Sequence, residues 1–112
     1  TDSAALENPS LMKQILREIE DTYTEDIALN SLAEKYNISV SRLSTRMKEK
    51  LGMSFTKYLT YRRVQRAKEL LIDESLSIEQ IAEMVGYRDY FYFIRVFKKA
   101  TGVSPSVYRK NL

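Results

Sequence analysis

The sequence predicts an all-α protein of about seven helices, arranged as two helix-turn-helix subdomains joined by a long central helix. Apolar residues recur at helical spacing along most of the chain, and no strand-like alternation is sustained. Only three glycines and two prolines occur in 112 residues, which leaves little room for a turn-rich β fold. The segment before the central helix also resembles the segment after it. We therefore expect subdomains at residues 9–53 and 74–112, a connecting helix at 54–73 and a lead-in or linker at 1–8.

The central helix is predicted from a cap and a continuous apolar ridge. Ser54 can accept a hydrogen bond from a first-turn N–H, which favours a helix start there. A helix of this length spans roughly 30 Å. The ridge that must be buried consists of Phe55, Tyr58, Leu59, Val64, Ala67, Leu70 and Leu71.

Three helices are expected before the central helix. Asn8 and Pro9 form a favourable helix start, and the following stripe is Leu11, Met12, Ile15, Ile19 and Tyr23. A short helix at residues 29–36 begins weakly, because Ala28 has no capping hydroxyl. Asn37 tolerates the left-handed conformation that ends a helix, and Ser39 can cap a helix at residues 40–51.

The same arrangement is expected after the central helix. Ser77 and Gln80 form a capping-box pattern that opens a helix ending at Val85. Gly86 closes this helix, and Asp89 can cap the next one, at residues 90–101. A last short helix follows the Ser-Pro pair at 104–105.

The two halves align as an internal repeat. At an offset of 49, residues 32–34 fall on 81–83 and residues 37–38 fall on 86–87. At an offset of 50, Ser39 falls on Asp89, and Leu43 and Met47 fall on two phenylalanines at 93 and 97. Two helix-turn-helix patterns at matching offset are much stronger evidence than one.

Composition narrows the function classes. The chain has no cysteine and no histidine, so disulfides, the usual zinc sites and a catalytic Cys or His are excluded. No nucleophile–base pair can be assembled from the remaining residues, and we predict neither an enzyme nor a cofactor. No apolar run approaches the roughly 20 residues that span a bilayer, which predicts a cytoplasmic protein.

Charge is unevenly distributed. Residues 1–36 contain three basic and eight acidic residues, whereas residues 37–112 contain fifteen basic and seven acidic residues. This balance indicates either a polyanionic partner for the later part or a solvated charged surface.

Burial patterns divide the second helix of each pair into two faces. In residues 40–51, Leu43 and Met47 are expected inside, which leaves Ser41, Ser44, Thr45 and Lys48 outside. In residues 90–101, Phe93, Phe97 and Ala100 are expected inside, which leaves Phe91, Ile94, Arg95 and Lys98 outside. The two outer sets occupy the same positions of the repeat.

The stretch from Ile27 to Arg109 resembles the C-terminal DNA-binding domain of the AraC/XylS family of bacterial transcription regulators. The resemblance implies seven helices, with two recognition helices entering successive major grooves on one face of double-stranded DNA. It also implies a sensor or receiver domain elsewhere in the parent protein, RNA polymerase as a partner, and a place at the nucleoid. The motif residues that carry it are Arg63-Val64, Ala67, Leu70-Leu71, Ser77-Ile78, Ile81-Ala82, Gly86-Tyr87, Tyr92-Phe93, Arg95, Phe97-Lys98-Lys99, Gly102, Ser104-Pro105 and Tyr108-Arg109.

The resemblance assigns expected DNA contacts to the outer faces of these two helices. Arg95 is the first candidate for base reading, because a guanidinium fork matches O6 and N7 of guanine. Shorter contacts to a base edge or a phosphate are expected from Ser41, Ser44 and Thr45, with Arg42 supplying longer reach. The residues expected at phosphates are Ser39, Lys48, Lys98 and Lys99.

Two positions depart from the family pattern, and their roles stay open. Phe91 and Ile94 stand where small or polar residues are commoner, so they either contact thymine methyl groups, widen the buried face, or dock a missing partner domain. The alternative function for the whole chain is a helical protein-interaction module that uses such exposed aromatic residues. Arg63 is expected to make an internal ion pair or hydrogen bond.

Overall fold

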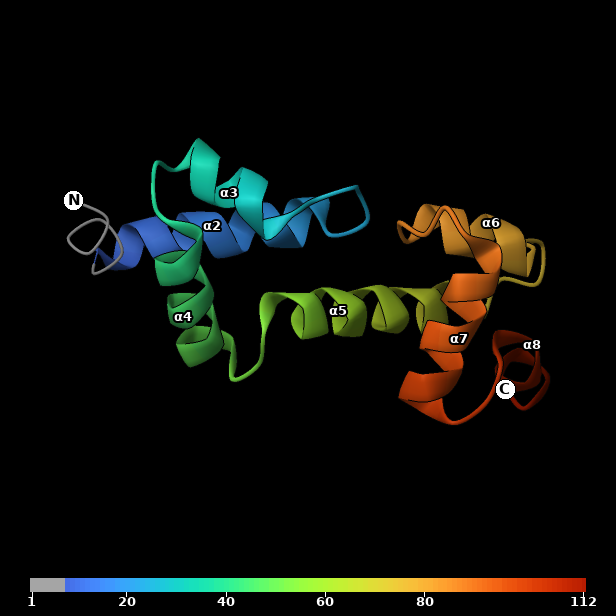
Figure 1. Cartoon of the computed structure of the whole chain (residues 1–112). Helices are drawn as coiled ribbons and strands as arrows, with labels where there is room; N and C mark the ends of the chain where they lie inside the picture. Colours follow the sequence, from blue (N-terminus) through green and yellow to red (C-terminus); the bar gives the residue numbers. More distant parts are fainter. Residues whose placement is uncertain (1–7) are drawn as a thin grey trace. The chain divides into compact units, whose positions relative to one another are not determined.

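The computed structural model describes residues 8–112, which form seven α-helices and no β-strand (Figure 1). The predicted all-α class is confirmed. The predicted lead-in at residues 1–8 lies outside the described residues except for Asn8. The helices are α2 (Pro9–Thr22), α3 (Leu29–Lys35), α4 (Val40–Leu51), α5 (Phe55–Leu70), α6 (Ile78–Met84), α7 (Tyr90–Thr101) and α8 (Pro105–Lys110).

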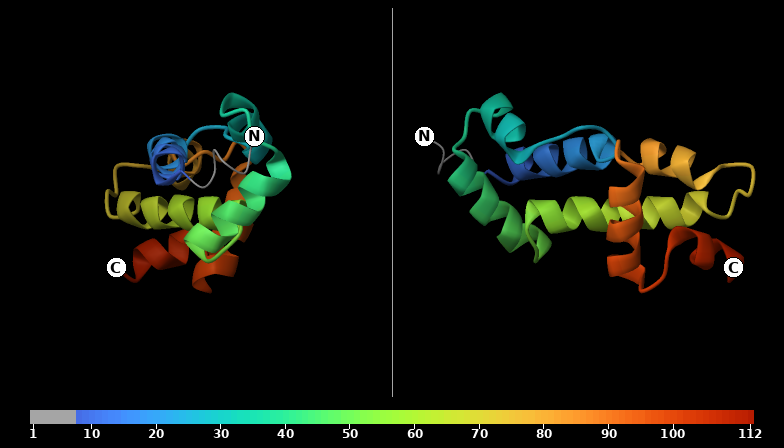
Figure 2. Two further views of the ribbon diagram at one scale, coloured as in Figure 1. Left: turned by 90° about the vertical axis from the view of Figure 1, so that its left-hand side faces the viewer. Right: turned by 45° about the vertical axis from the view of Figure 1, so that its right-hand side comes forward.

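The chain divides into two compact units, and the division falls inside α5. The first unit ends at Leu59 and the second begins at Thr60. The first contains the helix pair α3–α4 and the second contains the pair α6–α7 (Figures 1 and 2). In each pair a tight turn joins two helices that cross at a steep angle, which is the helix-turn-helix arrangement.

Each unit has its own hydrophobic core, to which the helix pairs contribute repeat-equivalent positions. Leu32 and Ala33 of α3 are buried in the first unit, as Ile81 and Ala82 of α6 are in the second. The first cluster consists of Met12, Ile15, Ile19, Leu32, Ala33, Ile38, Leu43, Met47 and Phe55. The second consists of Val64, Ala67, Leu71, Ile81, Ala82, Val85, Tyr87, Phe93 and Phe97.

Helix starts follow the capping residues of the sequence. Asp89 accepts hydrogen bonds from the backbone N–H groups of Phe91 and Tyr92, at 3.0 and 3.2 Å. The capping box of α6 is present, with Ser77 Oγ accepting from Gln80 N at 3.0 Å and Gln80 Oε1 accepting from Ser77 N at 2.8 Å. At α3, in contrast, Ala28 makes no side-chain cap bond.

The turn of each helix pair contains one residue in the left-handed region. Asn37 has φ 55° in the first turn, and Gly86 has φ 106° in the second. Asn and Gly adopt this conformation at the lowest cost, so the chain direction between the two helices is set locally. The residue after each, Ile38 and Tyr87, is buried and fills the corner.

Two details of the sequence prediction are wrong. The central helix ends at Leu70 and does not reach Asp73, because the N–H groups of Ile72 and Asp73 bond to carbonyls three residues back. Arg109 of α8 donates to the carbonyl oxygens of Leu71 and Asp73, at 3.0 and 3.1 Å, and holds this turn.

The second error concerns Ala100, which is exposed rather than buried. The buried face of α7 ends at Phe97, whose ring packs edge-on against Tyr108 of α8 with centroids 5.5 Å apart. Ala100 lies nearly one turn further toward the C-terminal end of the helix, beyond this packing.

Candidate nucleic-acid interface

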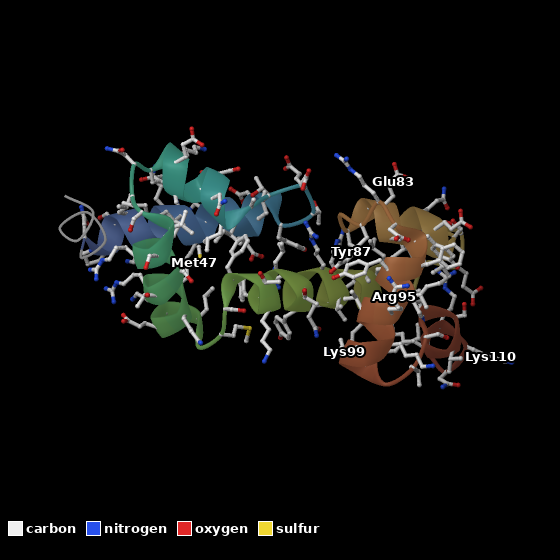
Figure 3. All side chains as sticks on the ribbon, viewed as in Figure 1. Met47, Glu83, Tyr87, Arg95, Lys99 and Lys110 are labelled. Atoms are coloured by element: carbon white, nitrogen blue, oxygen red, sulfur yellow. The ribbon has the colours of Figure 1, made fainter. Side chains whose placement is uncertain are left out.

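Helix α4 presents a polar face opposite its buried one. Leu43 and Met47 are fully buried in the core of the first unit. Figure 3 labels Met47 on this helix. The other side is exposed and carries Ser41, Arg42, Ser44, Thr45 and Lys48. We call these five residues the α4 face. Its hydroxyl, guanidinium and ammonium groups are the donors that can bond to base edges and phosphates.

Helix α7 presents a matching face in the second unit. Phe93 and Phe97 are fully buried, and half-buried Val96 packs beside them. The side chains predicted to meet DNA are Phe91, Ile94, Arg95, Lys98 and Lys99, which we call the α7 face; Figure 3 labels Arg95 and Lys99 on α7. All of them are exposed except Ile94, which is half-buried. The buried side of α7 is therefore wider than Phe93 and Phe97 alone predict.

Ser39 lies at the start of the α4 face. It is exposed, and its Oγ accepts a hydrogen bond from Arg42 N at 3.2 Å as the N-cap of α4. Asp89 is the equivalent cap of α7, so the second unit has a carboxylate where the first has a hydroxyl. Only the hydroxyl can also donate to a phosphate.

Arg95 lies over an aromatic ring of its own helix. Its guanidinium carbon is 5.6 Å from the centroid of the Tyr92 ring, within cation–π range. The prediction from sequence did not include Tyr92 in the interface. The spacing of three residues between Tyr92 and Arg95, which places both on one side of a helix, is the signal that could have found it.

The exposed side of helix α6 carries negative charge, in contrast to the cationic side chains of the α4 and α7 faces. A surface groove of about 500 Å³ beside α6 is lined by Ser77, Glu79, Gln80, Ala82, Glu83, Tyr87, Arg88 and Tyr90. Glu79 and Glu83 are both exposed, and Figure 3 labels Glu83 on this helix. Two carboxylates repel a phosphate backbone, so this side of α6 is a poor surface for DNA.

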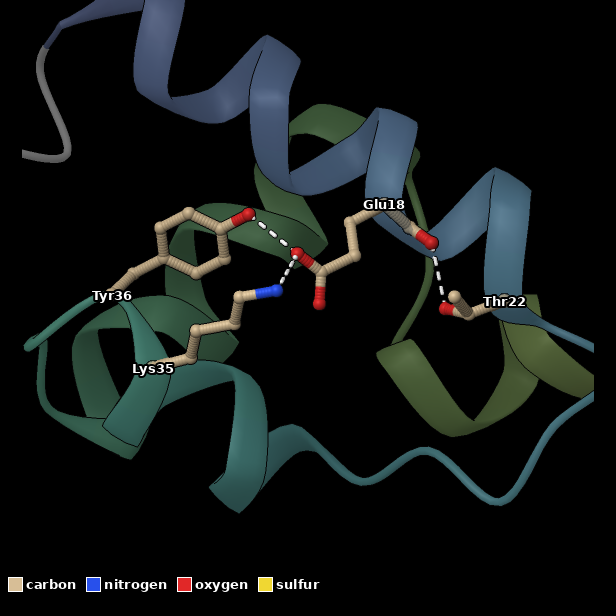
Figure 4. A network of polar contacts seen from close by, with 4 residues as sticks. All are labelled: Glu18, Thr22, Lys35 and Tyr36. Atoms are coloured by element: carbon tan, nitrogen blue, oxygen red, sulfur yellow. Dashed lines mark hydrogen bonds and ion pairs between the residues drawn. The ribbon is translucent and has the colours of Figure 1, made fainter.

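In the first unit, a polar network centred on Glu18 joins α2 to α3 (Figure 4). The Glu18 carboxylate of α2 accepts hydrogen bonds from Lys35 Nζ at 2.8 Å and from the Tyr36 hydroxyl at 2.6 Å. These bonds lower the pKa of Glu18, first through Lys35 and then through Tyr36. The bond to Glu18, followed by burial, raises the pKa of Tyr36 to about 12. The network joins α2 to α3 and takes no part in either polar face.

Arg63 behaves as an internal residue, as predicted. It is only 9% exposed, and its guanidinium carbon is 5.1 Å from the ring centroid of Tyr87. It therefore stabilises the second unit from within and is not placed to meet an external ligand.

The structure brings the predicted site residues onto two helices and the N-cap of one. Across residues 8–112, no group of three or more Asp, Glu, His or Cys side chains is arranged to hold a metal ion. In the same range, no helix is both long and apolar enough to cross a membrane. The arrangement offers hydrogen-bond donors and positive charge in each unit, opposite a closed hydrophobic core.

The chain is similar to a protein-family model, to curated proteins and to solved structures. Residues 32–111 match the family model described as a helix-turn-helix domain. The raffinose operon transcriptional regulatory protein RafR of Pediococcus pentosaceus is 37% identical over 94 residues, covering 84% of this chain and 34% of RafR. The chain spans about a third of the length of the curated relatives it matches.

Two solved domains share both fold and sequence with this chain. The C-terminal domain of AraT, a response regulator from Geobacillus stearothermophilus, is 42% identical with a TM-score of 0.85, covering 89% of this chain and 84% of that one. The C-terminal domain of the two-component response regulator yesN from Fusobacterium nucleatum is 38% identical with a TM-score of 0.84, covering 89% and 98% respectively.

Proposed function

We propose a mode of DNA reading for this chain, which belongs to the AraC/XylS family of helix-turn-helix transcriptional regulators as a DNA-binding domain. In this proposal α4 and α7 enter successive major grooves of a double-stranded site, and the α4 and α7 faces contact it. The observation that carries the proposal is that each unit exposes polar and cationic side chains on the second helix of its pair, opposite a buried face. One chain then reads an asymmetric site, because the two faces differ in chemistry.

Arg95 is proposed as the principal base-reading residue. Its guanidinium is exposed on α7 and can donate two parallel hydrogen bonds to O6 and N7 of guanine. A bidentate pair of this kind discriminates against other bases by about 1–3 kcal/mol.

The α4 face is proposed to read its groove with shorter side chains. Ser41, Ser44 and Thr45 are exposed along one side of the helix and can donate to or accept from base edges. Arg42, near the N-terminal end of α4, has the reach to contact a base or a phosphate further away. We expect weaker discrimination from this helix than from Arg95.

Phosphate contacts are proposed for the remaining cations and for one hydroxyl. Lys48, Lys98 and Lys99 are all exposed in the C-terminal halves of α4 and α7, and Ser39 caps α4. Contacts of this type fix the position of the protein on the duplex without reading sequence.

Phe91 and Ile94 are proposed to contact thymine methyl groups beside the Arg95 site. Phe91 is 69% exposed, a large apolar side chain in water on the same helix as Arg95. The same exposure favours a second candidate function, a protein-interaction surface centred on Phe91. A gel shift with random-sequence DNA at low salt separates the two, because an interaction module leaves that DNA unbound.

The parent protein is proposed to contain a sensor or receiver domain as well. The curated relatives are about three times as long as this chain, and AraT and yesN are named as response regulators. Transcription control further implies RNA polymerase as a partner and a cytoplasmic, nucleoid-associated site of action. We propose no catalytic role for this chain.

Replacement of Arg95 tests the proposed reading mode. We expect Arg95→Ala to abolish discrimination at one or two base pairs of a selected site, with non-specific binding reduced only slightly. The measurement is the dissociation constant for the selected duplex and for single-base-pair variants at fixed salt. Unchanged discrimination at every position would refute the placement of α7.

A further inference from the structure

Tyr92 connects the proposed base-reading arginine to the hydrophobic core of the second unit. Its ring centroid lies 5.6 Å from the Arg95 guanidinium carbon and 5.8 Å from the ring centroid of Tyr87. Tyr87 is only 8% exposed, and its ring is 5.7 Å from that of fully buried Phe93. Tyr92 itself is 48% exposed. The ring therefore lies at the boundary between core and solvent, within contact range of both neighbours.

Further contacts hold Tyr87 and Tyr92 in place. The Arg63 guanidinium carbon lies 5.1 Å from the Tyr87 ring centroid, which holds Tyr87 from the side of α5. The backbone N–H of Tyr92 donates to the capping carboxylate of Asp89, at 3.2 Å. Four side chains thus form a series that runs from a buried cation to an exposed one: Arg63, Tyr87, Tyr92 and Arg95.

The repeat-equivalent positions of the first unit carry different side chains. The repeat places Ile38 where the second unit has Tyr87, Arg42 where it has Tyr92, and Thr45 where it has Arg95. None of these three is aromatic, so these positions of the first unit supply no ring to the residue that stands where Arg95 stands in the second. The series is a specific feature of the second unit and not a consequence of the shared fold.

We propose that Tyr92 is a positioning residue that holds the Arg95 guanidinium in a reading conformation before DNA arrives. This inference rests on the proposed role of Arg95 in base recognition. A free arginine side chain has large rotamer entropy, which binding to a base must remove. A guanidinium that already lies on a fixed ring loses less entropy on binding, and it is presented to the correct base in a defined orientation.

The expected effect is small but specific. Removal of one exposed cation–π contact predicts a loss of about two- to five-fold in discrimination. Tyr92→Leu removes the ring and should show this loss at the base pair that Arg95 reads. Tyr92→Phe keeps the ring face and should retain wild-type discrimination. Thermal melting of both variants checks that the second unit remains folded.

A double-mutant cycle separates positioning from direct contact. Dissociation constants are measured for a selected duplex and for its variant at the Arg95-dependent base pair, with wild type, Tyr92→Leu, Arg95→Ala and the double variant. If Tyr92 acts through Arg95, Tyr92→Leu causes no further loss of affinity for the selected duplex in the Arg95→Ala background. A full additional loss of that affinity would overturn the proposal, because Tyr92 would then act on the DNA itself.

Failure of this inference differs from failure of the proposed function. If Arg95→Ala abolishes discrimination and Tyr92→Leu leaves it intact, the positioning role is wrong and the reading role stands. If Arg95→Ala changes nothing, both are wrong.

A second measurement does not depend on a variant that folds. Side-chain NMR relaxation of the free protein should show the Arg95 guanidinium more ordered than that of Arg42, the exposed arginine of α4. Equal disorder of Arg95 and Arg42 in the free protein would contradict the proposal as directly as the cycle.

Discussion

At the scale of single residues, Glu18 shows how one carboxylate can hold two helices together. It accepts a hydrogen bond from an ammonium and another from a phenol, both supplied by the end of α3. Its lowered pKa means that this stabilisation is present above the ordinary carboxyl pKa and is lost as pH falls through the folded-state value. The same bond has the opposite consequence for Tyr36.

Tyr36→Phe should make the alkaline stability of the first unit less dependent on pH. The Tyr36 pKa rises from 10.0 to about 12 in the folded chain, so the folded state holds this proton more tightly. Its stabilisation is complete below about pH 10 and is lost as pH rises through about 12. We expect Tyr36→Phe to cost about 1 kcal/mol at neutral pH and progressively less toward pH 11.5.

Urea unfolding of wild type and Tyr36→Phe at several pH values from 8 to about 11.5 measures this difference. Because Lys35 is present in both proteins, its own deprotonation is common to the comparison. If the difference in unfolding free energy between the two proteins stays constant over this range, the pKa of Tyr36 is not raised by folding and the prediction is wrong.

At the scale of helices, the repeat offers a natural comparison of two N-caps. Ser77 caps α6 with a complete capping box, whereas Ala28, at the equivalent position before α3, makes no side-chain cap bond. Both residues have extended backbone angles, with φ −74° and ψ 158° at Ser77 and φ −138° and ψ 147° at Ala28. The two helix starts therefore differ mainly in whether the N-cap side chain can accept a hydrogen bond.

Adding a capping side chain before α3 should raise the stability of the first unit, and removing the one before α6 should lower that of the second. Ala28→Ser is expected to stabilise the first unit by roughly 0.5–1 kcal/mol, and Ser77→Ala to destabilise the second by about 1 kcal/mol. Adding Ser31→Gln to Ala28→Ser places a glutamine at the N3 position and rebuilds the box. Thermal melting of the three variants measures these changes. No gain from Ala28→Ser, alongside a loss from Ser77→Ala, would contradict the equivalence of the two starts.

Local chemistry explains which elements could be predicted from sequence. Ser39, Ser77 and Asp89 cap helices where their positions predict, and Asn37 is left-handed where a turn requires it. These features depend on bonds between residues at most three apart or on backbone sterics, so a sequence window contains all the information they need.

Contacts between distant residues explain what could not be predicted. The end of α5 depends on Arg109, which is 38 residues from the carbonyl of Leu71 that it binds. The exposure of Ala100 depends on where the packing of α8 against α7 stops. The position of Tyr92 between Tyr87 and Arg95 likewise needs the fold of the turn before α7, which periodicity does not specify.

At the scale of the whole molecule, the distribution of charge sets the expected behaviour in salt. Residues 37–112 contain fifteen basic and seven acidic residues and include both proposed DNA-contacting faces. Affinity for DNA should therefore fall steeply as salt rises, because each neutralised phosphate releases condensed counterions.

Removal of one phosphate-contacting lysine should reduce the salt slope by about one unit. We expect this for Lys98→Ala on any duplex sequence, with specificity unchanged. Lys110→Ala, at an exposed lysine of α8 outside both faces (Figure 3), is the matched control and should leave the slope as it is. Equal slopes for Lys98→Ala and wild type would remove Lys98 from the interface.

Selection of bound sequences from a random pool of duplex DNA tests the central claim most directly. If α4 and α7 read successive major grooves, the selected sites contain two blocks of preferred bases whose centres are about 10 base pairs apart. A repeat of the selection with Arg95→Ala should lose a guanine preference in one block and keep the other block unchanged. A single block, or blocks that both persist with Arg95→Ala, would contradict this account.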